Sequence, residues 1–220
     1  MQEQPIIIHP KKPANASIIW LHGLGANGYD FVDIVPELNL PQAIAARFVF
    51  PHAPLSKVTI NGNMEMRAWF DIFGLTADSK QDENGIKKSQ QIIEQLIANE
   101  LEQGIPSNKI ILAGFSQGAA MSIYTGLRYK ETLGGILALS GFLPLAEQMP
   151  NEINEANKKT SIQMMHGTFD EIVQLSWAQQ SYKYLQGLGC DISLQTYPMH
   201  HSLCTEEIQD IGRWLGTVLS

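Results

Sequence analysis

Several features that define other classes of protein are scarce or absent in this sequence. Only 17% of its 220 residues are charged, the formal net charge is -7, and no basic cluster is longer than a pair of lysines. A nucleic-acid surface needs clustered lysine and arginine for its phosphate contacts, so we expect no nucleic-acid partner. No apolar run approaches the roughly 18 residues that a membrane-spanning helix needs, which argues against an integral membrane protein.

The start of the chain predicts a cytoplasmic location, which in turn bears on its two cysteines. Residues 1–5 contain neither the positively charged segment nor the apolar core of a secretory signal peptide. The two cysteines, Cys190 and Cys204, could form at most one bridge. Because we expect a cytoplasmic protein, we expect both thiols to be reduced and assign them no chemistry.

The length and the order of apolar segments predict a single domain, residues 1–220, with a doubly wound α/β fold. Short apolar segments alternate with helical ones, and the middle ones are continuously apolar, as in parallel strands buried on both faces. The first strand is expected at a sheet edge. The predicted strands are residues 6–8, 17–21, 47–50, 109–112, 135–139, 162–165 and 192–197. Apolar stripes with helical spacing predict helices at residues 86–101, 173–188 and 206–219, with another from residue 119.

Residues 51–74 form the irregular part of the chain. They contain turn-forming residues around Gly62, followed by large apolar side chains. Such a segment either packs down over the core or forms a flap above a pocket, and loops of this length are often functional lids. The sequence leaves these two alternatives open.

The most informative motif is a Gly-x-Ser-x-Gly sequence centred on Ser116. It follows the apolar residues 109–113 and precedes a predicted helix. Gly114 and Gly118 let neighbouring backbone pass the serine without a Cβ clash, which is typical of a nucleophile elbow. Such an elbow presents the serine hydroxyl above the sheet. It also places the amide of Gln117 at a helix N-terminus, where an oxyanion could be stabilised.

A nucleophilic serine needs a base and a carboxylate that orients the base. Asp170 and His201 each follow a predicted strand, so both should lie at the carboxyl edge of the sheet with Ser116. The order Ser116, Asp170, His201 is that of α/β-hydrolases. Asp170 could instead cap the next helix, and His201 could be only solvated. Finding all three after successive strands favours a catalytic triad.

A second glycine-rich segment, residues 22–28, reads Gly-x-Gly-x-x-Gly after the first interior strand. A dinucleotide site would need an acidic residue about 20 positions further on, at the end of the next strand. That strand is followed by Pro51 and His52, so we predict no cofactor. We assign the second oxyanion amide to Leu24 and expect His22 to orient the loop.

A metal site is not expected either. The chain has no His-Glu-x-x-His motif. His200, His201 and Cys204 are close in sequence but lack the remote partners that a closed zinc site requires.

These motifs together resemble the acyl-protein thioesterase and carboxylesterase family of small α/β-hydrolases. The Phe-Ser-Gln-Gly sequence at the elbow is far more specific than Gly-x-Ser-x-Gly alone, and the resemblance covers nearly the whole chain. The matching residues are 21–25, 69–71, 82–86, 114–118, 143–145, 166–167, 170, 201–202, 204 and 206–207. The resemblance implies an α/β-hydrolase fold with a mostly parallel sheet and helices on both faces. Residues 140–160 are too few for a large cap domain.

By this resemblance, Ser116, Asp170 and His201 carry over as the triad, and Leu24 and Gln117 supply the oxyanion amides. The flap at residues 51–74 would help to wall an acyl-chain channel. Its expected substrate contacts are Leu55, Met66, Trp69, Phe70 and, outside the flap, Phe142. His200 stands where relatives usually have glycine or methionine. Two histidines therefore compete for the role of base, and the family pattern favours the one directly before Ser202.

The resemblance implies a serine hydrolase that cleaves acyl esters or thioesters through an acyl-enzyme. The substrates implied are short carboxylic esters, lysophospholipids or palmitoylated proteins. The apolar flap could contact a membrane surface transiently, and the sequence leaves a homodimer open. One alternative is a non-catalytic binding protein on a hydrolase fold, against which the intact triad order argues. Another is a lipase or peptidase, which the small size and missing cap disfavour.

Overall fold

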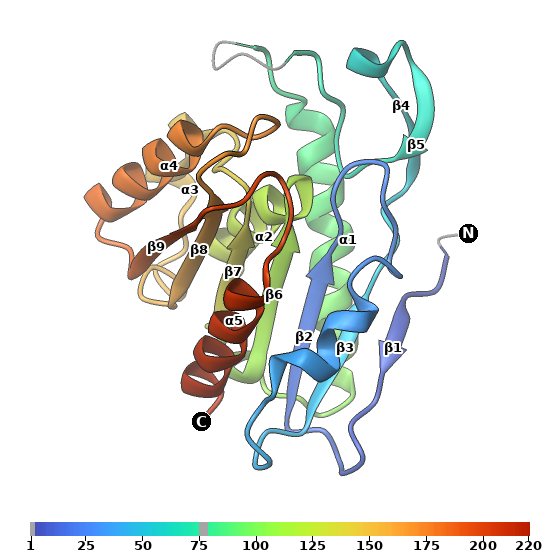
Figure 1. Ribbon diagram of the computed structural model, residues 1–220, viewed down its shortest axis with the longest axis vertical. Helices are drawn as coiled ribbons and strands as arrows, with labels where there is room; N and C mark the ends of the chain where they lie inside the picture. The colour runs from blue at the N-terminus through green and yellow to red at the C-terminus, as the bar shows by residue number, and fades with distance from the viewer. Residues whose placement is uncertain (1–2, 75–78) are drawn as a thin grey trace.

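The computed structural model describes residues 3–74 and 79–220, which are built around a mostly parallel sheet (Figure 1). Within these ranges the sheet has seven strands in the order β1-β3-β2-β6-β7-β8-β9. Each neighbouring pair is parallel except β1 and β3, which pair antiparallel at one edge. The strands are β1 (Ile6–Ile8), β2 (Ala16–Leu21), β3 (Ala46–Phe50), β6 (Ile110–Phe115), β7 (Gly135–Leu139), β8 (Ile162–Gly167) and β9 (Ile192–Tyr197). The predicted edge position of the first strand is confirmed.

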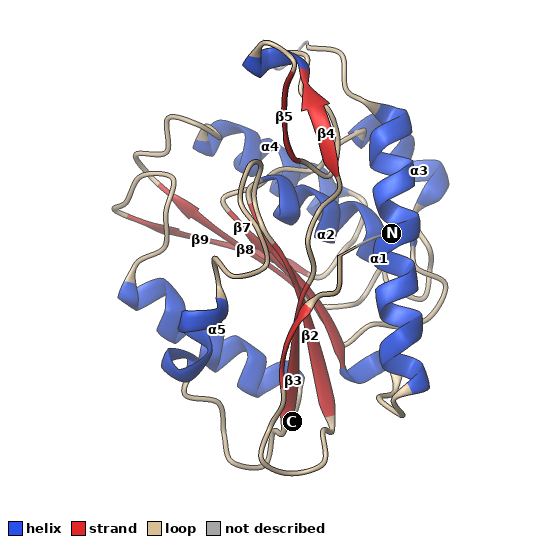
Figure 2. Ribbon diagram, turned by 90° about the vertical axis from the view of Figure 1, so that its right-hand side faces the viewer, coloured by secondary structure: helices blue, strands red, loops and turns tan. Residues whose placement is uncertain are grey.

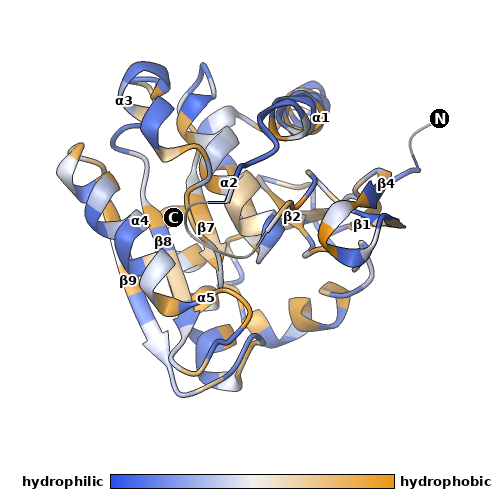
Figure 3. Ribbon diagram, turned by 90° about the horizontal axis from the view of Figure 1, so that it is seen from above, coloured by the Kyte–Doolittle hydropathy of each residue, from blue (hydrophilic) through white to orange (hydrophobic). Residues whose placement is uncertain are grey.

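Helices cover both faces of this sheet, as predicted. The α-helices are α1 (Glu83–Glu102), α2 (Gln117–Arg128), α3 (Met149–Glu152), α4 (Leu175–Gly187) and α5 (Thr205–Val218). Successive residues of a strand point to opposite faces, so Ile19 of β2 packs in the core with residues of α1 and α2, and Ile18 packs with residues of α5. Figure 3 shows α1 and α2 on one side of the sheet and α5 on the other. Between β7 and β8 the described chain contains only the four-residue α3 and a short 3-10 turn, so no large cap is present there.

Two strands continue beyond their apolar runs. β6 was predicted to end at residue 112 but includes Gly114 and Phe115, and β8 was predicted to end at residue 165 but includes His166 and Gly167. The added residues stay in register with neighbouring strands, since Phe115 pairs with residue 139 and Gly167 with residue 197. The catalytic candidates therefore follow almost directly after the ends of the strands.

The segment at residues 51–74 was expected to be irregular, but it contains a hairpin that stands above the main sheet (Figure 2). Its strands, β4 (Leu55–Val58) and β5 (Met64–Arg67), pair antiparallel in a separate two-stranded sheet. Gly62 and Asn63 have positive φ, the conformation that closes the turn. Four of the eight residues in the hairpin strands are exposed and only Val58 is buried, whereas residues 68–70 beyond β5 are all buried. Packing over the core therefore describes residues 68–70, and a flap above a pocket stays a prediction for the hairpin.

Two further features concern the cysteines and the length of the helices. Cys190 and Cys204 are both free thiols. In the described ranges, the helices are too short or too polar to cross a membrane.

Candidate active site

Ser116 occupies a tight turn between β6 and α2. Its φ of 56° and ψ of -117° lie in a region that non-glycine residues rarely adopt. Backbone hydrogen bonds hold this conformation, because Ser116 N donates to Leu139 O over 2.8 Å and its carbonyl accepts from Ala120 N over 3.1 Å. The flanking Gly118 is also enclosed, since a Cβ there would lie 2.2 Å from Leu21 O. The surrounding packing thus imposes the strained turn that a nucleophile elbow requires.

Asp170 and His201 meet at the same edge of the sheet, from the loops after β8 and β9. His201 Nδ1 lies 2.7 Å from Asp170 Oδ2, and the carboxyl group is fully buried. The other oxygen, Oδ1, accepts from the backbone N–H groups of Ile172 and Val173 over 2.9 and 2.8 Å. These bonds satisfy an ionised carboxylate, to which Nδ1–H donates. The second imidazole nitrogen, Nε2, is then free to accept a proton.

The structure separates the two neighbouring histidines. The ring of His201 lies against Phe115, with 4.7 Å between ring centroids, and Phe115 immediately precedes Ser116. His200 is exposed, and its ring lies 6.0 Å from that of Phe169. Only His201 of these two has an ion pair with Asp170 in the described part of the chain. Its position therefore fits the base better than that of His200.

A third histidine, His166, lies next to Asp170 and was not assigned a role from the sequence. Its Nε2 lies 2.7 Å from Val173 O and 3.4 Å from Asp170 Oδ2. Burial lowers the pKa of His166, and the Val173 carbonyl and Asp170 oppose that shift. A neutral ring with hydrogen on Nε2 donates to Val173 O and closes the loop around Asp170. The sequence signal was its place at the buried end of β8.

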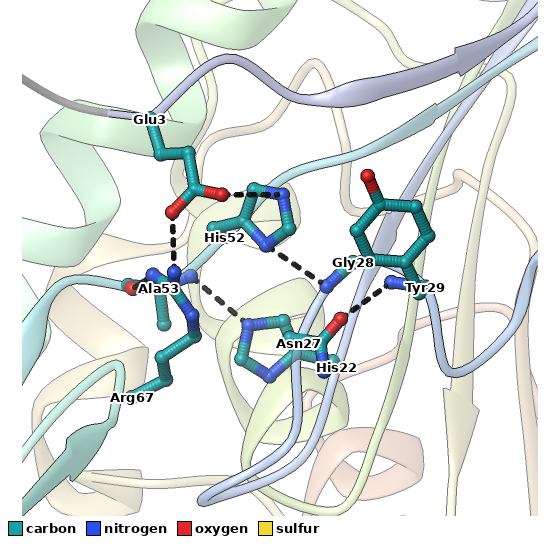
Figure 4. A network of polar contacts seen from close by, with 8 residues as sticks. All are labelled: Glu3, His22, Asn27, Gly28, Tyr29, His52, Ala53 and Arg67. Atoms are coloured by element: carbon teal, nitrogen blue, oxygen red, sulfur yellow. Dashed lines mark hydrogen bonds and ion pairs between the residues drawn. The ribbon is translucent and has the colours of Figure 1, made fainter.

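The glycine-rich loop at residues 22–28 is fixed by His22 (Figure 4). Ala53 N donates to His22 Nε2 over 3.0 Å, so the ring proton must be on Nδ1, which donates to Gly23 O over 2.7 Å. Burial lowers the pKa of His22, against the effect of the Gly23 carbonyl, and this favours the neutral ring. Trp69 Nε1 also donates to His22 O over 2.9 Å. The loop-orienting role expected for His22 fits these contacts.

Gln117 has a second role that the sequence did not reveal. Its backbone amide is at the first position of α2, as predicted, whereas its side chain is buried. The side-chain oxygen accepts from Trp69 N, and the side-chain nitrogen donates to Phe70 O, each over 2.8 Å. The glutamine thus fastens the chain after the hairpin to the elbow. This pairing gives a physical reason for glutamine in the Phe-Ser-Gln-Gly sequence.

A cavity of about 570 Å³ opens beside Ser116. Its volume is within the range of small-molecule sites, roughly 300 to 1,000 Å³. Five residues expected at the site from the sequence line it: Leu24, Phe70, Ser116, Gln117 and Phe142. Its other large apolar lining residues are Ile60, Ile72, Phe73, Leu143, Ile172, Val173, Trp177 and Tyr184. These walls suit an apolar chain next to the serine.

Three expected substrate contacts lie elsewhere. Leu55 is 60% exposed on the hairpin, and Trp69 is 2% exposed in the core, where its indole nitrogen is bonded to the glycine-rich loop. Met66 is half-buried, and its sulfur accepts from Asn61 Nδ2 over 3.2 Å. None of the three lines the cavity beside Ser116. In this segment, a large apolar side chain was therefore a poor predictor of contact with the cavity.

A second hollow, of about 460 Å³, is lined by residues of α1, α2 and α3. Its lining consists of Lys87, Gln90, Gln91, Glu94, Tyr124, Arg128 and Glu152. None of these is a serine, cysteine or histidine, so the hollow offers no nucleophile with a base. The cavity beside Ser116 is therefore the candidate active site.

An elbow serine after β6, a buried acid after β8 and a histidine after β9, at one edge of a mostly parallel sheet, define the class of this protein as an α/β-hydrolase. The family model described as phospholipase/carboxylesterase matches residues 2–219, and the chain belongs to that family. The chain is 38% identical to an acyl-protein thioesterase 1 of Debaryomyces hansenii, covering 94% of this chain and 93% of that protein. It is 36% identical to an acyl-protein thioesterase 1 of Neurospora crassa, covering 96% and 90%.

Solved structures agree with these relatives. Arabidopsis thaliana SOBER1 superposes with a TM-score of 0.89 at 31% identity, covering 94% of this chain and all of that one. Zea mays acyl-protein thioesterase 2 gives a TM-score of 0.87 at 26% identity and covers 99% of both chains. The resemblance found in the sequence is confirmed, and the protein is a serine hydrolase of the esterase and thioesterase type.

Proposed function

We propose that this enzyme cleaves acyl esters and thioesters in two steps, with Ser116 as nucleophile. His201 Nε2 takes the proton of Ser116 Oγ while that oxygen attacks the acyl carbonyl carbon. The backbone amides of Leu24 and Gln117 donate to the tetrahedral oxyanion, and Asp170 stabilises the imidazolium. The intermediate collapses, and the leaving alcohol or thiol departs with the proton from His201. Water then attacks the acyl-enzyme in the same way and releases the carboxylic acid.

The observation that carries this proposal is the 2.7 Å contact between His201 and the buried Asp170, beside an elbow that opens into an apolar cavity. A histidine paired with a buried carboxylate next to an elbow serine is the arrangement that takes a proton from the serine, which a binding protein would not require. The apolar walls suit the acyl group rather than a polar leaving group. No cofactor or metal takes part in these steps.

We propose acylated proteins as the first substrate class to test, because the thioesterase relatives carry that activity in their names. Lysophospholipids are the second class, suggested by the family description. The segment at residues 51–74 would act as the roof of the site, and its exposed apolar tip would touch the membrane that holds a lipidated substrate. A cytoplasmic, single-domain enzyme fits this proposal, and a homodimer is not required by it.

Hydrolysis of matched esters and thioesters, with acyl groups from acetyl to palmitoyl, tests the reaction. Wild type should turn over part of the series, and Ser116→Ala should lose activity by a factor on the order of 10⁴ to 10⁶. His201→Ala should behave like Ser116→Ala, whereas the adjacent His200→Ala is the matched control and should retain most activity. A wild-type enzyme that is inert to the series and to a fluorophosphonate probe would instead support a binding scaffold. The chain length with the highest rate separates a short-chain esterase from a depalmitoylating enzyme.

A further inference from the structure

A cluster of three polar residues lies behind the loop at residues 22–28, outside the cavity wall (Figure 4). Glu3 comes from the segment before β1, His52 follows β3, and Arg67 ends β5. The two oxygens of Glu3 face different partners, because one pairs with Arg67 Nη2 and the other lies 3.6 Å from His52 Nε2. Three distant segments of the chain therefore meet behind the loop that carries Leu24.

The direction of the Leu24 amide depends on the carbonyl of Gly23. Both belong to one planar trans peptide group, in which C=O and N–H point in opposite directions. The Gly23 carbonyl is bonded to His22 Nδ1 over 2.7 Å. Holding the carbonyl on the buried side turns the Leu24 N–H toward the opposite side, and Leu24 lines the cavity next to Ser116.

The proton on His22 Nδ1 depends in turn on Ala53. If the Ala53 N–H moved away from His22 Nε2, that nitrogen could carry the proton, and Nδ1 would then become an acceptor that repels the Gly23 carbonyl. The contact distance is now 3.0 Å. The position of Ala53 thus selects the tautomer that orients the oxyanion peptide.

Arg67 holds Ala53 and the loop at the same time. Its Nη1 donates to Ala53 O over 3.0 Å, and its own carbonyl accepts from Gly25 N over 2.8 Å. The first contact acts through the side chain and the second through the backbone. The loop is thereby fixed on both sides of Leu24, by His22 before it and by Arg67 after it.

His52 fixes the far end of the same loop. Its Nδ1 accepts from Gly28 N over 3.1 Å, and the ring is buried. A Cβ at Gly28 would lie 2.5 Å from Phe50 O, so the backbone there passes directly over the end of β3. Close packing leaves this end of the loop little room to move.

We propose that Arg67 is a positioning residue for acyl transfer, which holds the Leu24 amide in line with the oxyanion through Ala53 and His22. The inference rests on the proposed function of the site. Since Arg67 is the last residue of β5, it also couples the hairpin to the oxyanion hole. Residues on the roof thus set the geometry of a group that stabilises the transition state.

The test compares wild type with Arg67→Met, which keeps an unbranched apolar stem and removes the guanidinium donors. Misplacing one oxyanion donor should lower kcat about tenfold and weaken binding of a trifluoromethyl ketone inhibitor by about the same factor, with KM nearly unchanged. Arg67→Lys keeps the positive charge and an ammonium group that can donate, and should recover part of the loss. Lys57→Met on the neighbouring strand of the hairpin is the matched control, because Lys57 is exposed and pairs in register only with Glu65.

The ¹⁵N NMR shifts of the His22 ring nitrogens distinguish a positioning role of Arg67 from a purely structural one. Wild type should show hydrogen on Nδ1, and Arg67→Met should show a mixture of tautomers. The inference is overturned if folded Arg67→Met keeps wild-type kcat, or if kcat falls while inhibitor affinity and the His22 tautomer stay unchanged. If Arg67→Met does not fold, Arg67→Lys must show the same changes at smaller size. The NMR measurement needs no turnover, so an inactive wild type would defeat the proposed function and leave this result interpretable.

Discussion

The two sides of the active site are built in different ways. Ser116, Asp170 and His201 follow β6, β8 and β9, three strands of the main sheet whose register fixes their relative positions. The hairpin forms its own two-stranded sheet and is joined to the site by a few contacts, chiefly those of the Arg67 side chain and backbone and of the Gln117 side chain. Substitutions at these positions on the sheet side should therefore abolish activity or folding rather than reduce it slightly. Substitutions on the hairpin side should have smaller, graded effects on activity and stability.

The largest expected effect on the sheet side is that of Asp170→Asn. The asparagine oxygen can still accept from Ile172 N and Val173 N, which leaves the amide NH₂ facing His201 Nδ1. Nδ1 must then accept, so Nε2 carries the proton and cannot act as a base. We expect kcat to fall by a factor on the order of 10⁴ with KM little changed.

Steady-state kinetics and circular dichroism check this result. Glu171→Gln is the matched control, because Glu171 is the adjacent acidic residue and is exposed. A folded Asp170→Asn enzyme with more than about one tenth of wild-type kcat would contradict the role of Asp170, since a wrong tautomer leaves far less activity.

The contrast between the two sides also explains what the sequence could predict. Each catalytic candidate follows a continuous apolar strand, and parallel strands bring their carboxyl ends to one edge, so Asp170 and His201 could be placed together without coordinates. The strands of the hairpin have four residues each and only one buried side chain between them, so they give no apolar pattern. Trp69 was expected at the substrate but is buried. Its position depends on hydrogen bonds to residues 22 and 117, which no local pattern encodes.

A pair of glycine substitutions sharpens the comparison through stability. In Gly118→Ala the new Cβ would lie 2.2 Å from Leu21 O, so the elbow or β2 must move. We expect a loss of roughly 3 to 5 kcal/mol in the free energy of unfolding, or insoluble protein. Gly62 in the hairpin turn has φ of +66° with open space around it, so Gly62→Ala should cost only about 1 kcal/mol. Urea denaturation measures both, and equal losses would contradict the proposed difference between the two sides.

A buried acid on the sheet side predicts a pH dependence of stability. Glu207 in α5 is fully buried, and burial raises its pKa from the ordinary 4.5 to about 8, although the backbone of Cys204 acts in the opposite direction. Between these two values the folded chain binds a proton that the unfolded chain has lost. Stability from this group is therefore present below about pH 4.5 and is lost as pH rises to about 8.

Glu207→Gln should remove this dependence, because glutamine does not ionise. Relative to the variant, wild type should lose up to about 1.4 kcal/mol per pH unit across that window, as judged by urea denaturation at successive pH values. Glu206→Gln, at the exposed neighbour, is the control and should keep the wild-type slope. Parallel stability curves for wild type and Glu207→Gln would show that Glu207 is already ionised in the folded protein.

The smallest expected effect is on the hairpin, where Leu55 at the base is 60% exposed and Met64 next to the turn is 64% exposed. Replacing both by serine removes little buried surface, so the free energy of unfolding should change by no more than about 0.5 kcal/mol. Neither side chain lines the cavity beside Ser116, and hydrolysis of a short soluble ester should also stay near wild type. If the hairpin contacts membranes as proposed, hydrolysis of a palmitoylated peptide on vesicles should fall while the soluble ester serves as the internal control. Equal rates on vesicles would remove the membrane contact from the proposal and leave the chemistry on the sheet side intact, because the two sides are fixed by separate interactions.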